Sequence, residues 1–200
     1  DLKPATFDNY ELGVRRGFAG NKGKLDVALY RLNGKNEIVS YTISSGNSEP
    51  RNAGKTRHTG IELGTTYALN EQWETRLATA FARHEYLDYD ASTTLSYDDK
   101  IIKGSPENIT NAEIAWKPLA GLRLGLEVQH LSQYWMNDAN TVEYPGHTVS
   151  NLRALYRVSD GPSLFLGNLN VYPTDARREI TLGRAAEVFR DRGWPVPDEI

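Results

Sequence analysis

Cysteine is absent from the 200 residues, and methionine occurs once. The sequence therefore contains no disulfide framework and no thiolate metal site. Long apolar runs are also missing: no stretch approaches the roughly 20 apolar residues of a membrane-spanning helix, which excludes a helical membrane protein. Strong net charge is lacking as well, since the formal net charge is −3 and the pI about 5.9. Nothing in this balance predicts nucleic acid as a partner.

A secretory signal is not visible at the start, because residues 1–10 are polar and lack an apolar core. We therefore expect a processed chain or a piece of a longer protein. The mean hydropathy of −0.56 suggests a soluble protein at first sight. That inference is unsafe, because strands with one lipid-facing and one wet side also keep the mean low.

Apolar and polar residues alternate along most of the chain. In residues 122–129, Leu122, Leu124, Leu126 and Val128 share one side, and the residues between them, Arg123 to Gln129, share the other. A period of two is typical of a β-strand. The pattern recurs in residues 10–14, 25–30, 61–67, 73–81, 111–116 and 151–157, more weakly in 163–169, and a ninth strand is predicted to begin at 178–183. The fold class is therefore all-β, an antiparallel up-and-down meander of about eight or nine strands.

The predicted connections differ in length. Short ones are 68–72, 117–121 and 158–162, with a somewhat longer Gly-rich link at 17–23; long ones rich in turn-forming residues are 33–56, 85–107 and 133–147. One strand is predicted to run from 121 to 136. Short turns at one end and long loops at the other are typical of an outer-membrane barrel, so we expect an arc of a transmembrane β-barrel.

Aromatic residues gather at both predicted strand ends. Next to the short turns lie Tyr67, Trp73, Trp116 and Tyr156, interpreted as a membrane-interface girdle. Towards the long loops lie Tyr41, Tyr86, Tyr89, Tyr134, Trp135 and Tyr144. The alternative interpretation is that aromatic residues are simply common in strands.

Catalytic and metal chemistry find little support. The four histidines form no H-x-x-x-H pair, and His84 and Glu85 would face opposite ways on a strand, so no metal site is predicted. No G-x-S-x-G elbow is present, and no enzyme is expected. The glutamates at 62, 74, 113 and 127 are predicted to face a wet interior beside Arg76, Arg123 and Arg153. Inward glycines at 13, 64 and 125 suggest curvature or a closely approaching plug.

Ligand binding is expected where the strands emerge into the long loops. The candidate residues are His84, Tyr86, Tyr134, Trp135, Asp138 and Tyr144. Their rings would stack on a planar chelate and their polar groups would bond its rim, although Tyr134 and Trp135 would equally suit an outer girdle.

Several segments resemble the β-barrel of TonB-dependent receptors. They are 2–14 (LKPATFDNYELGV), 52–63 (NAGKTRHTGIEL), 129–147 (QHLSQYWMNDANTVEYPGH), 151–156 (NLRALY), 163–169 and 178–183. The resemblance implies a 22-stranded barrel in the Gram-negative outer membrane, with a plug domain through which TonB drives import. It implies outer-membrane lipid as surroundings and a ferric siderophore, haem or cobalamin as cargo. No resident cofactor is implied.

The chain end departs from the family pattern. Residues 1–183 correspond to part of the barrel, whereas 184–200 lack the closing aromatic strand and predict a short helix or an irregular tail. Two alternatives to a receptor fragment stay open here: a small complete outer-membrane barrel with a structural or adhesive role, and a soluble all-β ligand-binding domain.

Overall fold

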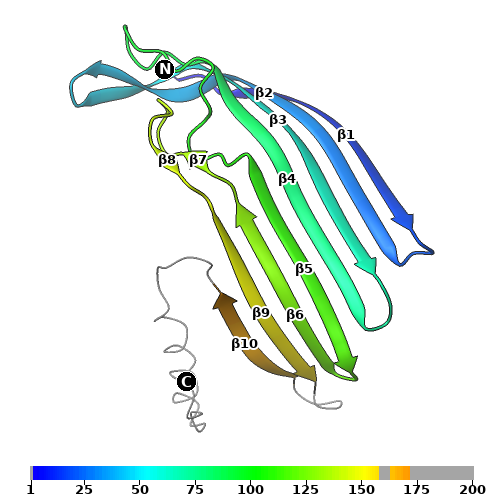
Figure 1. Ribbon diagram of the computed structural model, residues 1–200. Coiled ribbons are helices and arrows are strands. Elements are labelled where there is room, and N and C mark those ends of the chain that lie inside the picture. The colour runs from blue at the N-terminus through cyan, green and yellow to red at the C-terminus, as the bar shows by residue number, and fades with distance from the viewer. Residues whose placement is uncertain (1, 158–162, 172–200) are drawn as a thin grey trace, which may run out of the picture. The chain divides into compact units, whose positions relative to one another are not determined.

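The computed structural model describes residues 2–157 and 163–171, which form ten β-strands (Figure 1). Eight strands make one sheet in the order β1-β2-β3-β4-β5-β6-β9-β10, and β7 and β8 pair separately. Their bounds are β1 Thr6–Phe18, β2 Gly23–Ser44, β3 Asn47–Ala68, β4 Trp73–Asp88, β5 Asn108–Leu119, β6 Leu122–Leu131, β7 Tyr134–Trp135, β8 Glu143–Tyr144, β9 His147–Arg157 and β10 Ser163–Val171. The predicted all-β antiparallel meander is confirmed. Any ninth long strand at 178–183 and the tail 184–200 lie outside the described residues.

The chain divides into two compact units. The first comprises the chain up to Thr66 with Leu77–Thr110 and His130–His147; the second comprises Tyr67–Arg76, Asn111–Gln129 and the chain from Thr148 on. The first unit therefore holds the long-loop ends of the strands, and the second holds the short turns after β3 and β5.

Strands β1 and β2 show how alternation becomes two faces. They pair antiparallel from Thr6↔Lys35 to Phe18↔Gly23, so Leu12 lies opposite Leu29 and Val14 opposite Val27. Directly opposed residues of an antiparallel pair share a face. On the other face, Arg15 lies opposite Asp26 and forms an ion pair with it. The turn between the strands places Ala19, Gly20 and Asn21 at positive φ.

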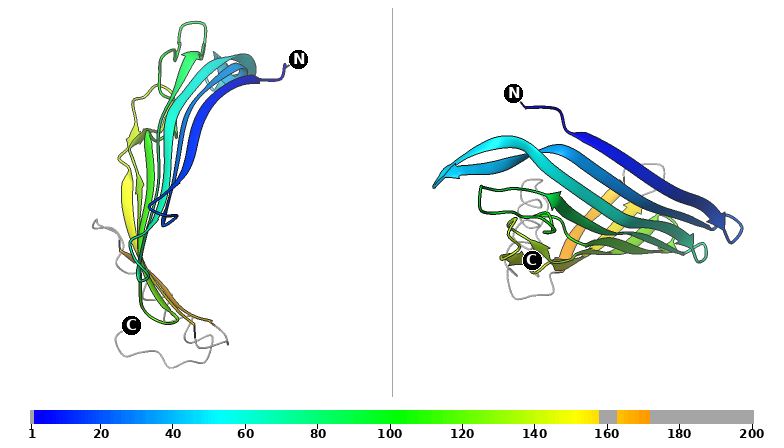
Figure 2. Two further views of the ribbon diagram at one scale, coloured as in Figure 1. Left: turned by 90° about the vertical axis from the view of Figure 1, so that its right-hand side faces the viewer. Right: turned by 90° about the horizontal axis from the view of Figure 1, so that it is seen from above.

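The predicted long loop at 33–56 is wrong. Strand β2 continues to Ser44, β3 begins at Asn47, and the connection is a tight turn with Gly46 at φ 78°. Residues 37–44 (EIVSYTIS) include four β-branched residues, and such residues favour a strand. This preference outweighs the turn-forming tendency of the neighbouring Gly and Asn residues. Because β1 ends its pairing at Lys35, β2 and β3 extend beyond it as a two-stranded ribbon (Figure 2).

The predicted strand at 121–136 is also wrong in its length. Strand β6 ends at Leu131. The Ser132 amide still donates to the Asn108 carbonyl of β5 (2.9 Å), and the chain then turns into the β7–β8 hairpin. The predicted loop at 85–107 is confirmed except at its start, because β4 continues to Asp88 before the loop begins. The short connection at 158–162 lies outside the described residues.

Apolar side chains of the described residues gather in one small core cluster, in which Tyr86 and Tyr97 pack against Val39, Tyr89 and Ala91, whereas the long strands keep their apolar faces exposed. Among the described residues, the buried apolar side chains are Val39, Tyr89, Ala91 and Ala115, whereas Ile114, Leu126 and Leu152 remain 39%, 41% and 46% exposed. A soluble sandwich would have to bury these residues between its sheets. The described strands therefore lack the packed second sheet that the soluble alternative requires. Among the described residues, no helix is long and apolar enough to cross a membrane.

Candidate functional site

Two long loops, residues 89–107 and 132–146, are joined at Asp138. The Tyr86 hydroxyl, at the end of β4, donates to Asp138 Oδ1 at 3.0 Å, and Lys103 Nζ lies 2.8 Å from Oδ2. Burial, together with the Asp138 carboxylate, raises the pKa of Tyr86 above its usual range, and the hydrogen bond to Asp138 raises the pKa of Lys103. The Asp138 side chain is only 13% exposed, so this charged contact is shielded from water.

A second contact between these loops uses Asn140, which has φ 55°. Its side chain accepts from the Ile101 amide and donates to the Ile101 carbonyl, both at 2.8 Å. The Gly104 amide also donates to the Trp135 carbonyl at 2.8 Å. The two loops therefore form one hydrogen-bonded assembly.

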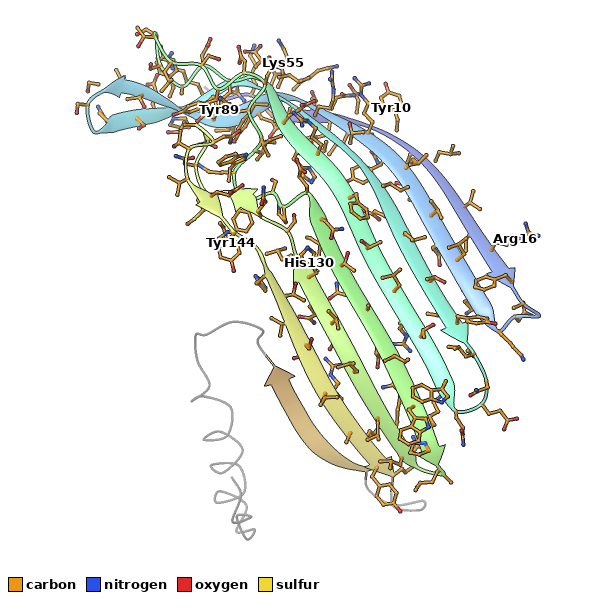
Figure 3. The ribbon with its side chains drawn as sticks, viewed as in Figure 1. Tyr10, Arg16, Lys55, Tyr89, His130 and Tyr144 are labelled. Carbon is orange, nitrogen blue, oxygen red and sulfur yellow. The ribbon has the colours of Figure 1, made fainter. Side chains whose placement is uncertain are left out.

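The β2–β3 ribbon supports this assembly. The Tyr89 hydroxyl donates to the Ser40 carbonyl at 3.1 Å, and the Thr42 amide donates to the Ala91 carbonyl at 2.7 Å. Tyr89 packs between Tyr86 and Tyr97 in edge-to-face contacts and is 5% exposed (Figure 3). Tyr89, one of the aromatic residues towards the long loops, therefore has a buried ring that does not face the surroundings.

Strands β7 and β8 bring three rings together. The rings of Tyr134 and Tyr144 lie 5.0 Å apart at 33°, as expected for residues directly opposed in the hairpin. The Tyr144 hydroxyl is 2.9 Å from His147 Nδ1. Tyr134 and Tyr144 are half-buried, so part of each ring remains accessible.

A cavity of about 560 Å³ lies next to this hairpin. Its lining combines aromatic, acidic and hydroxyl groups with one imidazole: Ile101, Ser105, Glu107, His130, Ser132, Gln133, Tyr134, Trp135, Glu143 and Pro145. Cavities of about 300–1,000 Å³ with a few polar groups among apolar ones are typical of small-molecule sites. The position of Tyr134 and Trp135 in the lining therefore suits ligand binding as well as a girdle.

A chain of polar side chains runs across β2, β3 and β4. Nδ1 of His84 lies 2.7 Å from Nδ1 of His58, Nε2 of His58 lies 3.1 Å from the Thr56 hydroxyl, and that hydroxyl bonds the Glu37 carboxylate. The carboxylate only accepts, so each link must donate towards it: Thr56 to Glu37, His58 Nε2–H to Thr56, and His84 Nδ1–H to His58. This order leaves the lone pair on Nε2 of His84 available for a ligand.

Burial sets the protonation of this pair. It lowers the pKa of both histidines below the usual 6.5, and the charge of His58 lowers the pKa of His84 further. Glu37 acts in the opposite direction on the pKa of His58. Two glycines make room for Glu37, since a Cβ on Gly34 would collide with the Glu37 carboxylate and with Thr56, and a Cβ on Gly54 would lie 3.1 Å from Glu37 Cβ.

Ion pairs line one face of the second unit. Arg123 lies 2.7 Å from Glu113, Arg153 lies 2.7 Å from Glu127, and Arg76 lies 3.1 Å from Glu74. Gly125 stands beside the first pair, where a Cβ would lie 3.1 Å from Glu113 Oε1. The expected ladder of charges is present, and Gly125 makes room for it. The other face carries Ile114, Leu126 and Leu152.

Aromatic side chains mark the short turns of the same unit. The rings of Trp73 and Trp116 stack at 5.6 Å and 12°. The backbone joins the two strands at this level, because the Lys117 amide donates to the Gln72 carbonyl at 2.8 Å. Tyr67 and Tyr156 each lie one residue before the end of their strand, β3 and β9 respectively.

The six candidate ligand residues fall into three contacts. Tyr86 meets Asp138, Tyr134 stacks on Tyr144 beside Trp135, and His84 meets His58. Sequence reasoning missed the contact of His58 with His84, because no local pattern gives the register between β3 and β4. It also missed Lys103, Tyr97 and His147, which lie in loops where no periodicity gives their partners. Among the described residues, no cluster of three or more His, Cys, Asp or Glu is placed to hold a metal ion.

Comparison with known proteins gives the family. The family described as "TonB dependent receptor-like, beta-barrel" matches residues 1–171. The chain belongs to this family. Members of this family are outer-membrane proteins of Gram-negative bacteria. The resemblance of the chain to TonB-dependent receptors is thereby confirmed.

Individual relatives are distant and much longer. The TonB-dependent receptor chain is 23% identical over 154 residues to the ferrioxamine receptor of Yersinia enterocolitica, covering 75% of this chain and 20% of that protein. Its fold is similar to the siderophore receptor PiuA of Acinetobacter baumannii (TM-score 0.67, 19% identity, 83% of this chain and 24% of that one). It is also similar to the ferric yersiniabactin uptake receptor FyuA of Yersinia pestis (TM-score 0.61, 18% identity, 76% and 22%). The chain thus spans about a fifth to a quarter of these relatives.

Proposed function

We propose that this chain is part of the barrel wall and outer loops of a receptor that imports a ferric siderophore or a similar metal chelate. The observation that carries the proposal is the family match over residues 1–171. The joined loops add a physical reason, because they hold aromatic rings and an oriented imidazole at one end of the strands before any cargo arrives.

The groups at this end suit a planar, metal-bearing ligand. Tyr134, Trp135 and Tyr144 offer ring faces for stacking, and Asp138 and Tyr86 offer polar contacts if the loops part. His84 offers Nε2, with the hydrogen bond at Nδ1 fixing its tautomer as second-shell partners do for histidine ligands.

The test uses the intact receptor that contains this chain, in cells that lack other receptors for the same chelates. Uptake of radiolabelled iron is measured for hydroxamate, catecholate and citrate chelates. We expect Trp135→Ala and Tyr134→Ala to weaken binding of the accepted chelate about 5- to 30-fold, because each removes about 1–2 kcal/mol of stacking. Tyr10→Ala, on the face of β1 away from the Arg15–Asp26 pair, is the control. Receptor that assembles but imports no chelate would contradict the proposal.

We propose that the strands cross the outer membrane with the long loops outside. Along β4 the membrane-spanning stretch would run from Trp73 to Phe81, at the lower end of the roughly 9–11 tilted residues that a bilayer requires. Tyr67, Trp73, Trp116 and Tyr156 would then form the girdle at the short-turn side. Quenching of Trp73 and Trp116 fluorescence by lipids brominated at different depths measures this, and strongest quenching at the bilayer centre would exclude the girdle.

We further propose that import is driven by TonB acting on a plug domain that this chain does not include. Deleting TonB in the same cells should abolish uptake but leave chelate binding at the surface. Uptake that continues without TonB would indicate a passive pore.

A further inference from the structure

Two imidazole nitrogens face each other across β3 and β4, which are neighbours in the sheet (Figure 1). Nδ1 of His58 lies 2.7 Å from Nδ1 of His84, and the two ring planes are tilted by 57°. Two protonated rings would place N–H against N–H at this distance, so only one proton lies between the nitrogens. Both side chains are half-buried, so water reaches the pair.

The ring of His58 is held in one orientation from its other side. Its Nε2–H donates to the Thr56 hydroxyl at 3.1 Å, and this hydroxyl donates to the Glu37 carboxylate. Thr56 is fully buried, so these bonds are shielded from water. A lone pair on Nδ1 of His58 therefore points at His84. A histidine that binds a metal ion almost always donates its other ring N–H to a polar acceptor in this way, which fixes its tautomer.

The place of the shared proton suits a metal ion. If the His84 proton moves through water from Nδ1 to Nε2, the Nδ1 lone pairs of both rings point at one spot, and the pair neither gains nor loses a proton. An ion bound about 2.0–2.1 Å from each nitrogen, at an angle of about 90–110°, needs the nitrogens to lie about 2.9–3.4 Å apart. The rings therefore have to separate by only about 0.2–0.7 Å from their 2.7 Å contact.

We propose that His58 and His84 together bind one free Cu²⁺ or Zn²⁺ ion through their Nδ1 atoms, with water completing its coordination. Imidazole suits these ions, and a given nitrogen site binds Cu²⁺ more tightly than Zn²⁺. Mg²⁺ and Ca²⁺ prefer oxygen ligands, and the one carboxylate connected to the pair, Glu37, is engaged by Thr56. Because structural zinc sites use four protein ligands, a site with two exchanges its ion with the solution. The proposal does not rest on the chelate cargo proposed above.

The test compares ions before it compares variants. The intact receptor is purified in detergent, stripped of metal, and titrated with Cu²⁺, Zn²⁺ and Mg²⁺ in a buffer that does not bind these ions. We expect saturable binding of Cu²⁺, weaker binding of Zn²⁺ and none of Mg²⁺. Electron paramagnetic resonance of the Cu²⁺ complex should show splitting from two nitrogens. A Cu²⁺ spectrum without nitrogen splitting would overturn the proposal without any mutation.

The variants then locate the site. His58→Gln and His84→Gln should each weaken Cu²⁺ binding at least about tenfold and remove the splitting from one nitrogen. Glu37→Gln keeps both ligands but weakens the support of His58, so it should weaken binding about tenfold and keep the splitting from both nitrogens. His130→Gln is the matched control, because His130 lines the cavity beside the β7–β8 hairpin. Unchanged Cu²⁺ affinity in His58→Gln and His84→Gln, or an equal loss in His130→Gln, would place the ion elsewhere and overturn the proposal.

Discussion

Gly121 lies in the turn between β5 and β6 with φ 84°. A Cβ at this residue would lie 2.6 Å from the Arg157 carbonyl oxygen, while the Gly121 carbonyl accepts the Arg157 amide at 2.9 Å. Both the backbone conformation and the close approach of β9 therefore require glycine at this position.

We expect Gly121→Ala to lower the free energy of unfolding by about 1–3 kcal/mol more than the same change at Gly20, because its Cβ would also collide with the Arg157 carbonyl oxygen. Thermal unfolding of the intact receptor in detergent measures the change. Gly20→Ala is the matched control: Gly20 also has positive φ, at 65°, but no atom lies within 4 Å of its added Cβ. Equal destabilisation by the two variants would show that the contact with β9 contributes nothing.

The histidine pair makes a second residue-scale prediction, which concerns pH. The pKa of both histidines is lowered in the folded chain, so the unfolded chain takes up more protons below pH 6.5. The stability contributed by the His58–His84 contact is therefore present above pH 6.5 and is lost as the pH falls through the lowered pKa values.

Hydrogen exchange at the imidazole C2 position, followed by mass spectrometry, measures each histidine separately. Replacing His58 by Gln should raise the pKa of His84, because the charge of His58 lowers it. Replacing Glu37 by Gln should lower the pKa of His58 further, because Glu37 raises it. An unchanged pKa of His84 in the first variant would show that the two rings do not interact.

At the scale of elements, the two loops joined by Asp138 and Asn140 act as one cover over the strand ends. Asp138→Asn removes the ion pair with Lys103 and weakens the bond from Tyr86. We expect the local opening free energy of residues 89–107 to fall by about 1–2 kcal/mol, since Lys103 is 55% exposed and water screens part of the interaction.

Amide hydrogen exchange of the intact receptor measures this opening. Asp99→Asn is the control: Asp99 lies in the same loop, and its carboxylate makes no contact with residues 132–146 in the described chain. Faster exchange of residues 89–107 in the control than in Asp138→Asn would contradict a joining role for Asp138.

Sequence patterns predicted some of the elements correctly and others wrongly. Alternation located the eight long strands, because each has a wet side and an apolar side along its length. It failed at 33–56, where Asn36 has φ 57° and the alternation is interrupted. The sequence predicted which residues belong to the candidate site but not which of them contact each other. Those contacts depend on the register between β3 and β4 and on hydrogen bonds within the loops, and no local sequence pattern encodes either. Asp138 and Tyr86 are 52 residues apart in the chain.

At the scale of the whole molecule, the two faces of the wall predict opposite responses to added charge. Leu126 is 41% exposed on the apolar face of β6, whereas Gln129 lies on the face of Glu127. Replacing Leu126 by Lys should destabilise the assembled receptor by about 2–4 kcal/mol, the cost of a cation near the bilayer centre. Gln129→Lys should assemble normally. Heat-modifiable migration of outer-membrane fractions measures both, and normal assembly of Leu126→Lys would mean that lipid does not contact this face.

Strand β1 has a consequence for handling the molecule. In the described chain it hydrogen-bonds only to β2, so the amide and carbonyl groups along its other edge have no strand beside them. With Tyr10, Leu12 and Val14 exposed on one side, that edge is a template onto which a second copy can add, and a third onto the second. Produced without its neighbouring strand, this piece should therefore grow into fibrils, and a synthetic peptide that pairs with β1 should act as a chain terminator.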